Sequence, residues 1–405
     1  MTGAESKSKI LFVDDEDNVL RGLARMLRTR RDAWDMSFVN SGQAALDFLE
    51  KNKVEVVVSD MRMPGMNGAE LLNKVRERWP DTIRIVLSGF AERESILKTI
   101  GPSHRYLAKP CTEQVLTEAI THSLKLRKQL QAETLRKAIT GLTHIPTLPD
   151  VYARVLRELS DELASAESLA EIVEKDVSIS AQLMKLTNSA YFSLQRPCTT
   201  VKQAINFIGF ENVRATVLLA GVFEQFRSIA PTLVQVVERL TRRSIGIATL
   251  AQAIARNDGA SQEIADQSFC AGVLAHLGTI VLIANQPKQF VDAMSKADTA
   301  RGSWLDTEYE MFGATHAQIG GYILGLWGFS DGVVEAVTYH HNPSALTSAA
   351  APILTAVHVA QYMTRLKATG HGELDQAYLS ASGQTERLKS WQSVFEEVTK
   401  DWPDE

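Results

Sequence analysis

Short runs of Val, Ile, Leu and Phe, each followed by a segment of helical spacing, recur five times in the first third of the chain. The runs lie at residues 10–14, 36–40, 54–60, 83–88 and 105–109. Continuous apolar runs of this length are typical of strands that are buried on both faces, as in a parallel sheet. Five such units predict an α/β doubly wound, five-stranded parallel sheet with its functional residues at the carboxyl ends of the strands.

The strand-like alternation then ends, and apolar residues recur at three- and four-residue spacing, as at Ile179, Leu183 and Leu186. This spacing predicts an all-helical second domain over residues 141–405 that ends in a C-terminal helical extension. A chain of 405 residues is long enough for two or three domains, whose cores need no disulfide or metal.

One long helix is predicted where the two patterns meet, from about residue 112 to 140. Residues 125–137 contain five basic residues and one acidic residue. Such a charge run suits a solvated helix face, and the alternatives are a regulated connector or the seam of a homodimer. The predicted boundaries are 1–125 for the first domain, 126–140 for a helical connector and 141–405 for the second domain.

The composition is that of an ordinary globular protein, with 45% hydrophobic and 22% charged residues. A net charge of −5 argues against binding of nucleic acid or a membrane surface by the whole protein. Three dispersed cysteines predict reduced thiols and a cytoplasmic location. No signal-peptide core precedes Ile10, and the uncharged stretches at 267–287, 311–330 and 342–364 are predicted to be buried helices rather than membrane spans.

Charged and hydroxyl side chains follow the predicted strands at the points where they end. Asp14 and Asp15 follow the first strand, Asp60 the third, Ser88 the fourth and Lys109 the fifth. Crowded carboxylates repel one another, so such a cluster favours a hard divalent cation such as Mg²⁺. A phosphoryl group on Asp60 would lie between the metal, the Ser88 hydroxyl and the Lys109 ammonium, which together would stabilise phosphoryl transfer.

The segments FVDDE, SDMRMPGMNG, LSG and YLAKP at these strand ends resemble the response-regulator receiver domain, which has a flavodoxin-like fold, over about 115 residues. The resemblance implies a role for each residue of the set: Asp60 as phospho-acceptor, Asp14 and Asp15 as Mg²⁺ ligands with Asp60 and the backbone carbonyl of Arg62, Ser88 and Tyr106 as the switch pair, and Lys109 as the contact to the phosphoryl group.

Three segments of the second domain, at residues 145–156, 171–192 and 204–220, resemble the HDOD domain. That family is a non-catalytic relative of the HD-type metal phosphohydrolases. The resemblance extends over roughly 141–345, and the usual DP dipeptide of the family is DV here, at residues 176–177.

A catalytic HD site holds its metals with histidines and with aspartates, one of which bridges the two ions. The resemblance places the corresponding positions of this chain at Arg243, His276, Leu277, His316, His340, His341 and Gln361. Leu277 and Gln361 replace both carboxylates. A guanidinium about 4 Å from a charge is worth roughly 4 kcal/mol per unit charge at an effective dielectric of 20, so Arg243 would repel a dication. We therefore expect no metal in the HDOD domain and no hydrolysis.

The four histidines leave two further interpretations open. They are packed or hydrogen-bonded helix residues, or they hold a single zinc ion. His340 and His341 are adjacent, about 100° apart on a helix, so both cannot point squarely at one centre. A segment at 248–267 resembles a helix-turn-helix, but it offers acids and no base after Arg256, which disfavours DNA binding.

The two resemblances together predict a two-component response regulator. Asp60 would accept phosphate from a sensor histidine kinase or a phosphotransfer protein, and the switch would control an HDOD output domain that binds a downstream protein or a nucleotide. Beyond the receiver's own Mg²⁺-dependent phosphorylation and dephosphorylation, no enzyme activity is expected. The alternatives are an HD-type metal phosphohydrolase or cyclic dinucleotide phosphodiesterase with a reduced metal site, and a transcription factor.

Overall fold

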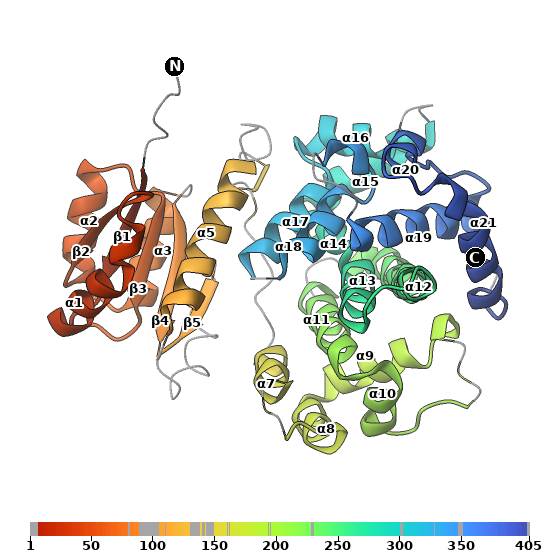
Figure 1. The fold of residues 1–405 in the computed structure, drawn as a ribbon, viewed down its shortest axis with the longest axis horizontal. Coiled ribbons are helices and arrows are strands. Elements are labelled where there is room, and N and C mark those ends of the chain that lie inside the picture. Colours follow the sequence, from red (N-terminus) through yellow and green to blue (C-terminus); the bar gives the residue numbers. More distant parts are fainter. Residues whose placement is uncertain are drawn as a thin grey trace. The chain divides into compact units, whose positions relative to one another are not determined.

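The structure is a computed structural model of the chain, and it divides into two compact units (Figure 1). The first contains residues 1–141 with 325–328, and the second contains 142–324 with 329–405. Residues 89–104, most of the predicted connector and the first five residues of the HDOD-like segment at 145–156 lie outside the described residues. The structure describes residues 7–79, 82–88, 105–109, 111–129, 138–139, 142, 150–159, 161, 163–192, 194, 196–227, 231–299, 303–327, 329–346 and 351–402.

The first unit is built on one parallel sheet whose strands follow the predicted apolar runs. The strands are β1 (Ser8–Val13), β2 (Trp34–Val39), β3 (Val56–Asp60), β4 (Ile83–Ser88) and β5 (Arg105–Ala108). Their order is β2-β1-β3-β4-β5, and all neighbours are parallel. The predicted doubly wound fold is therefore confirmed, and its strand order reverses between β1 and β3, the position where such sheets bind ligands.

Helices cover both faces of this sheet, which explains why successive positions of its central strands are apolar, as in the run from Ile10 to Val13 of β1. The helices are α1 (Asp17–Met26), α2 (Gly42–Lys51), α3 (Gly68–Arg78) and α5 (Glu113–Gln129). Leu11 and Val57 pack in one core with residues of α2 and α3, whereas Phe12 and Val58 pack in a second core with residues of α1 and α5. Successive residues of a strand thus enter opposite cores.

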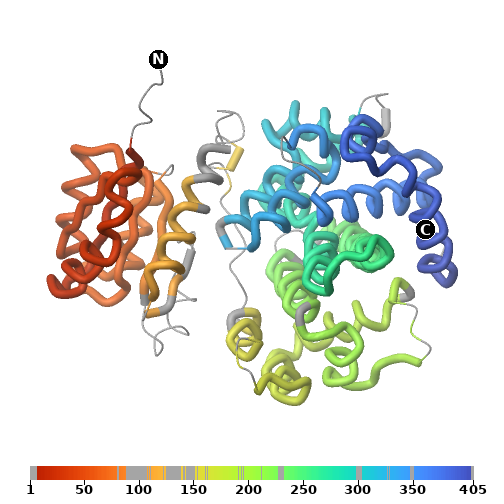
Figure 2. Tube along the Cα trace, viewed as in Figure 1, coloured from red at the N-terminus to blue at the C-terminus, as the bar shows by residue number. Residues whose placement is uncertain are grey.

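The second unit consists of helices and connecting loops, with no strand among its described residues, as the spacing predicts (Figure 2). Its helices are α7 (Asp150–Leu159), α8 (Ala166–Glu174), α9 (Val177–Thr187), α10 (Val201–Ile208), α11 (Phe210–Arg227), α12 (Val234–Asn257), α13 (Gln262–Leu274), α14 (Leu277–Asn285), α15 (Pro287–Thr299), α16 (Trp304–Phe312), α17 (His316–Leu326), α18 (Asp331–Tyr339), α19 (Pro352–Thr369), α20 (Gln376–Ala381) and α21 (Leu388–Val398). Asp176 accepts a hydrogen bond from the backbone N of Ile179 and so caps α9.

Small residues allow the central helices of this unit to approach closely. A Cβ at Gly272 of α13 would lie 2.5 Å from the Cα of Ala248 on α12, and a Cβ at Gly278 of α14 would lie 2.0 Å from the backbone oxygen of His316 on α17. Among the described residues, one apolar stretch, Gln262–Asn285, is long enough to span a membrane, but 94% of its apolar window is buried inside the protein.

Candidate functional site

Two groups of buried side chains carry ionisable or metal-ligating atoms. The first group lies at the carboxyl ends of the parallel strands. Asp14 directly follows β1 and is 2% exposed, while Asp60 ends β3 and is 8% exposed. Lys109, which follows β5, donates a hydrogen bond to Asp14 Oδ2 at 2.7 Å and a second one to Asp60 Oδ1. The structure thus brings together three of the residues that the sequence placed at the strand ends, and Asp15 is exposed beside them.

The turn after β3 is folded tightly against Asp60. The backbone N of Arg62 donates to Asp60 Oδ2 at 2.6 Å, and the backbone N of Gly68 donates to the carbonyl of Met61 at 2.9 Å. A Cβ at residue 68 would lie 2.1 Å from the backbone oxygen of Asp60, so this close approach requires glycine. Both carboxylate oxygens of Asp60 are therefore held in place, one by an ammonium and one by a backbone amide.

The charges of this cluster do not cancel. Burial raises the pKa of Asp60 above its ordinary value, and the Asp14 carboxylate raises it further, against the lowering effect of Lys109. Burial by itself would lower the pKa of Lys109, but its hydrogen bonds to Asp14 and Asp60 raise it, so the ammonium stays charged. Asp14, Asp15 and Asp60 supply three carboxylates, and Lys109 supplies one ammonium. The surplus negative charge fits an oxygen-ligated dication such as Mg²⁺.

The predicted switch residues lie on the two strands next to this cluster. Ser88 ends β4 and pairs with Ala108 of β5, directly before Lys109, while Tyr106 pairs with Val86. The side chains of Ser88 and Tyr106 lie outside the described part of the structure.

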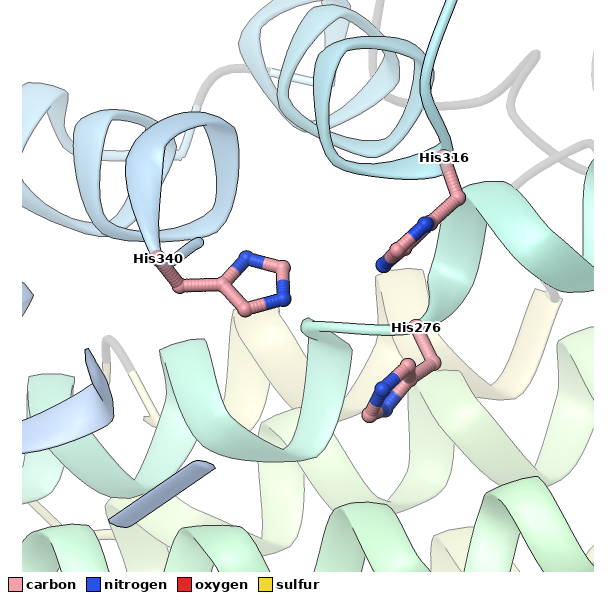
Figure 3. A group of neighbouring side chains, drawn as sticks. All are labelled: His276, His316 and His340. Carbon is pink, nitrogen blue, oxygen red and sulfur yellow. The ribbon is translucent and has the colours of Figure 1, made fainter. Parts of the chain in front are cut away.

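The second group is a buried set of histidines in the helical unit. His276 lies between α13 and α14, His316 begins α17 and His340 follows α18. They are 5%, 2% and 0% exposed, and one nitrogen from each ring lies within 4.8 Å of the corresponding nitrogens of the other two. The three rings extend from separate chain segments toward a common space (Figure 3).

The hydrogen bonds of these rings identify some of their protonated nitrogens. His340 Nδ1 lies 2.8 Å from the carbonyl oxygen of Val337, which only accepts, so Nδ1 carries the proton and Nε2 carries a lone pair. His340 Nε2 is buried and has no hydrogen-bond partner among the described residues. His276 Nδ1 is 3.1 Å from the hydroxyl of Ser244.

A buried carboxylate that the sequence analysis missed belongs to this group. Glu308 of α16 is 0% exposed, and its Oε2 accepts hydrogen bonds from the backbone N of His316 at 2.9 Å and from His316 Nδ1 at 2.7 Å. The spacing of Glu308 from Leu305 and Phe312 on one face of a helix would have indicated its burial. The neighbouring acids Asp306 and Glu310 are exposed.

Burial keeps most of these histidines neutral. It lowers the pKa of His340 to about 3, and it lowers the pKa of His276 well below the ordinary value, with Arg243 as the next cause. The pKa of His341 is also lowered well below its ordinary value by burial and by the neighbouring His340. Neutral imidazoles are the form that ligates metals.

The remaining predicted positions lie on α14 and α19 and directly after α18. His341 Nε2 is 3.2 Å from His316 Nε2, so His341 contacts the group of three histidines but is not one of its members. Leu277 is buried in α14, and Gln361 of α19 is 5% exposed with no hydrogen-bond partner for Oε1 among the described residues. His358, which the sequence analysis did not single out, donates from Nδ1 to the carbonyl of His340 at 2.7 Å.

Comparison with known proteins divides the chain at nearly the same place as the structure does. The model of the response regulator receiver domain matches residues 10–121, and the model of the HDOD domain matches residues 145–343. The chemotaxis protein CheY of Pseudomonas aeruginosa is 34% identical over 120 residues, which are 28% of this chain and 92% of that protein.

Longer relatives share only part of their length with the chain. The hydrogenase transcriptional regulatory protein HoxA of Cupriavidus necator is 32% identical over 168 residues, which are 41% of this chain and 32% of that protein. The chain thus spans about a third of that regulator. A crystal structure of an HDOD domain protein of unknown function from Geobacter sulfurreducens matches 67% of this chain and 99% of its own, at 19% identity and a TM-score of 0.49.

Proposed function

Since the chain belongs to the response regulators and carries a receiver domain followed by an HDOD domain, we propose that phosphorylation of Asp60 controls binding by the HDOD domain. The phosphoryl donor is a histidine kinase or a phosphotransfer protein, the partner that a receiver domain implies. The downstream partner is a protein or a nucleotide, and we place this exchange in the cytoplasm.

The contact of Lys109 with both Asp14 and Asp60 is the observation that carries this proposal. A carboxylate oxygen of Asp60 forms a bond to the phosphorus of the donor's phosphohistidine while the N–P bond breaks and the donor's imidazole leaves. The ammonium of Lys109 meets the negative charge of the phosphoryl oxygens during this transfer. The amide of Arg62 holds the other carboxylate oxygen, so the nucleophile is oriented before the donor arrives.

Asp14, Asp15 and Asp60, with the backbone carbonyl of Arg62, are the residues that would hold Mg²⁺. When bound, the cation neutralises part of the charge on the transferred group. A phosphoryl group adds about −1.5 to −2 charges, enough for one to three new charge-assisted hydrogen bonds. We infer that Ser88 and Tyr106, on the adjacent strands, respond to that charge.

The output acts by binding rather than by catalysis. A two-metal HD centre needs a bridging carboxylate, and the apolar, fully buried Leu277 occupies that position. Gln361 at the other carboxylate position offers only a neutral amide. These two side chains favour a binding module over a metal phosphohydrolase.

A small phosphodonor such as acetyl phosphate tests the acceptor assignment directly. In the presence of Mg²⁺, the full chain should gain one phosphoryl group by intact-protein mass spectrometry, and Asp60→Asn should gain none. Asp47→Asn, which changes an exposed aspartate on α2, is the matched control and should be labelled like the wild type. Equal labelling of Asp60→Asn would refute the assignment.

A further inference from the structure

We propose that His276, His316 and His340 bind one transition-metal dication, such as Zn²⁺, in a site that Glu308 orders. This inference concerns the helical unit alone and goes beyond the proposed function. It does not depend on phosphorylation of Asp60, so either proposal can fail without the other.

The geometry of the three rings suits a single ion. Zn²⁺ binds imidazole nitrogens at about 2.0–2.1 Å, so tetrahedral ligands lie about 3.4 Å apart. The three nitrogens already lie within 4.8 Å of one another, and small ring rotations bring them to that spacing. Figure 3 shows the rings surrounding one common space.

The protonation pattern leaves lone pairs available where the ion would bind. His340 donates from Nδ1 to the carbonyl of Val337, which leaves its buried Nε2 with a lone pair and no hydrogen-bond partner among the described residues. His316 directs Nδ1 at the Glu308 carboxylate, so in the neutral ring that donates from Nδ1 the lone pair is on Nε2. A buried polar atom without a partner destabilises the fold, and a metal ion bound at His340 Nε2 would relieve that cost.

Glu308 has the position of the carboxylate that often supports a metal-binding histidine. Such a carboxylate accepts from the second ring nitrogen, orients the ring and increases the basicity of the ligating nitrogen. Glu308 also accepts from the backbone N of His316, so both the ring and the start of α17 are held. Its Oε1 has no hydrogen-bond partner in the described part of the chain, which leaves negative charge inside the group.

This carboxylate changes the charge balance that argued against a metal. Arg243 acts on the group, because its charge contributes to the lowered pKa of His276. Glu308 adds a buried carboxylate beside His316, and its negative charge opposes the repulsion that Arg243 exerts on a dication.

The ligand set points to one ion of borderline softness. Three imidazoles suit Zn²⁺, Fe²⁺ or Co²⁺ better than Mg²⁺ or Ca²⁺, which prefer oxygen. A second ion lacks its bridging ligand, since Leu277 is apolar. His341 now lies 3.2 Å from His316 Nε2, and the ion replaces that hydrogen bond.

Metal content and the Co²⁺ spectrum of the full chain test the site. Protein refolded with Zn²⁺ or Co²⁺ should hold about one ion per chain after gel filtration, and His316→Ala should hold under about 0.1. The Co²⁺ form should show the visible absorption of a tetrahedral nitrogen-ligated ion. His371→Ala, which removes an exposed histidine outside the group, is the control and should bind like the wild type.

Glu308→Gln keeps the shape of the side chain and separates metal binding from folding. In chelator competition it should bind Co²⁺ about 10–100-fold more weakly, because only the supporting charge is lost. Circular dichroism verifies that each variant is folded. Wild-type protein without ions after refolding, equal metal content in His316→Ala, or equal affinity in Glu308→Gln would each overturn the proposal.

Discussion

Asp60 carries its negative charge at a cost to stability, because its carboxylate is buried beside the carboxylate of Asp14. Lys109 offsets part of that cost by donating to both side chains. Removing water from a carboxylate favours its neutral form, and burial together with the Asp14 carboxylate outweighs the lowering by Lys109 and the Arg62 amide, so the pKa of Asp60 is raised. A bound cation would reduce the repulsion between the buried carboxylates of Asp60 and Asp14, and phosphorylation would remove the carboxylate charge of Asp60.

We predict that Asp60→Asn is more stable than the wild type at pH 7.5 in EDTA, and that the difference shrinks as the pH falls. The folded-state pKa of Asp60 lies above its ordinary value of 3.8, so the folded chain binds this proton at a higher pH than the unfolded chain. The stabilisation that the protonated Asp60 carboxyl gives to the folded state is fully present below pH 3.8, and it is lost as the pH rises through the folded-state pKa.

Thermal unfolding followed by circular dichroism from pH 4 to pH 7.5 measures this difference. Asp47→Asn, an exposed aspartate on α2, should track the wild type at every pH. An Asp60→Asn protein that melts below the wild type at pH 7.5 would show that the charge stabilises the fold.

The residues at the strand ends could be predicted from sequence, whereas the surroundings of the histidines could not be predicted in full. Asp14, Asp60 and Lys109 each end a predicted strand of a parallel sheet, so their place at one sheet edge follows from the chain order. His276, His316 and His340 were identified by resemblance. Glu308 lies eight residues before His316 on another helix, and only the packing of α16 against α17 brings its carboxylate to that ring.

At the scale of elements, local patterns predicted the helices and strands, and glycines decide how closely they pack. Apolar periodicity identifies which face of a helix is buried, but it does not give the distance between two helices. Gly278 allows the start of α14 to approach the start of α17, which places His276 next to His316. No motif in the sequence marks that contact.

We predict that Gly278→Ala destabilises the helical unit by about 1–3 kcal/mol or more, because the added Cβ would meet backbone that cannot rotate away. It would lie 2.0 Å from the backbone oxygen of His316. Gly22→Ala in α1 is the control, since its Cβ would have no atom within 4 Å. That change should be neutral or should stabilise by up to about 1 kcal/mol. Equal melting temperatures for Gly278→Ala and the wild type would contradict the packing described.

At the scale of the whole molecule, the chain joins a receiver unit that carries the proposed phosphorylation site to a helical unit that carries a buried group of histidines. In the receiver unit Asp15 is exposed and Lys109 is half-buried at the sheet edge that holds Asp14 and Asp60. The histidines of the helical unit are buried instead. The proposed function therefore requires that phosphorylation, through a change at β4 and β5, alter the conformational equilibrium of the helical unit.

Hydrogen exchange of the full chain, measured by mass spectrometry with and without acetyl phosphate and Mg²⁺, tests this coupling most directly. Phosphorylation should change exchange in β4, β5 and α5 and also in the helical unit, by about tenfold where an equilibrium shifts by about 1.4 kcal/mol. Asp60→Asn should show neither change. Altered exchange at β4 and β5 of the wild type, together with unaltered exchange throughout residues 150–402, would contradict control of the HDOD domain by Asp60.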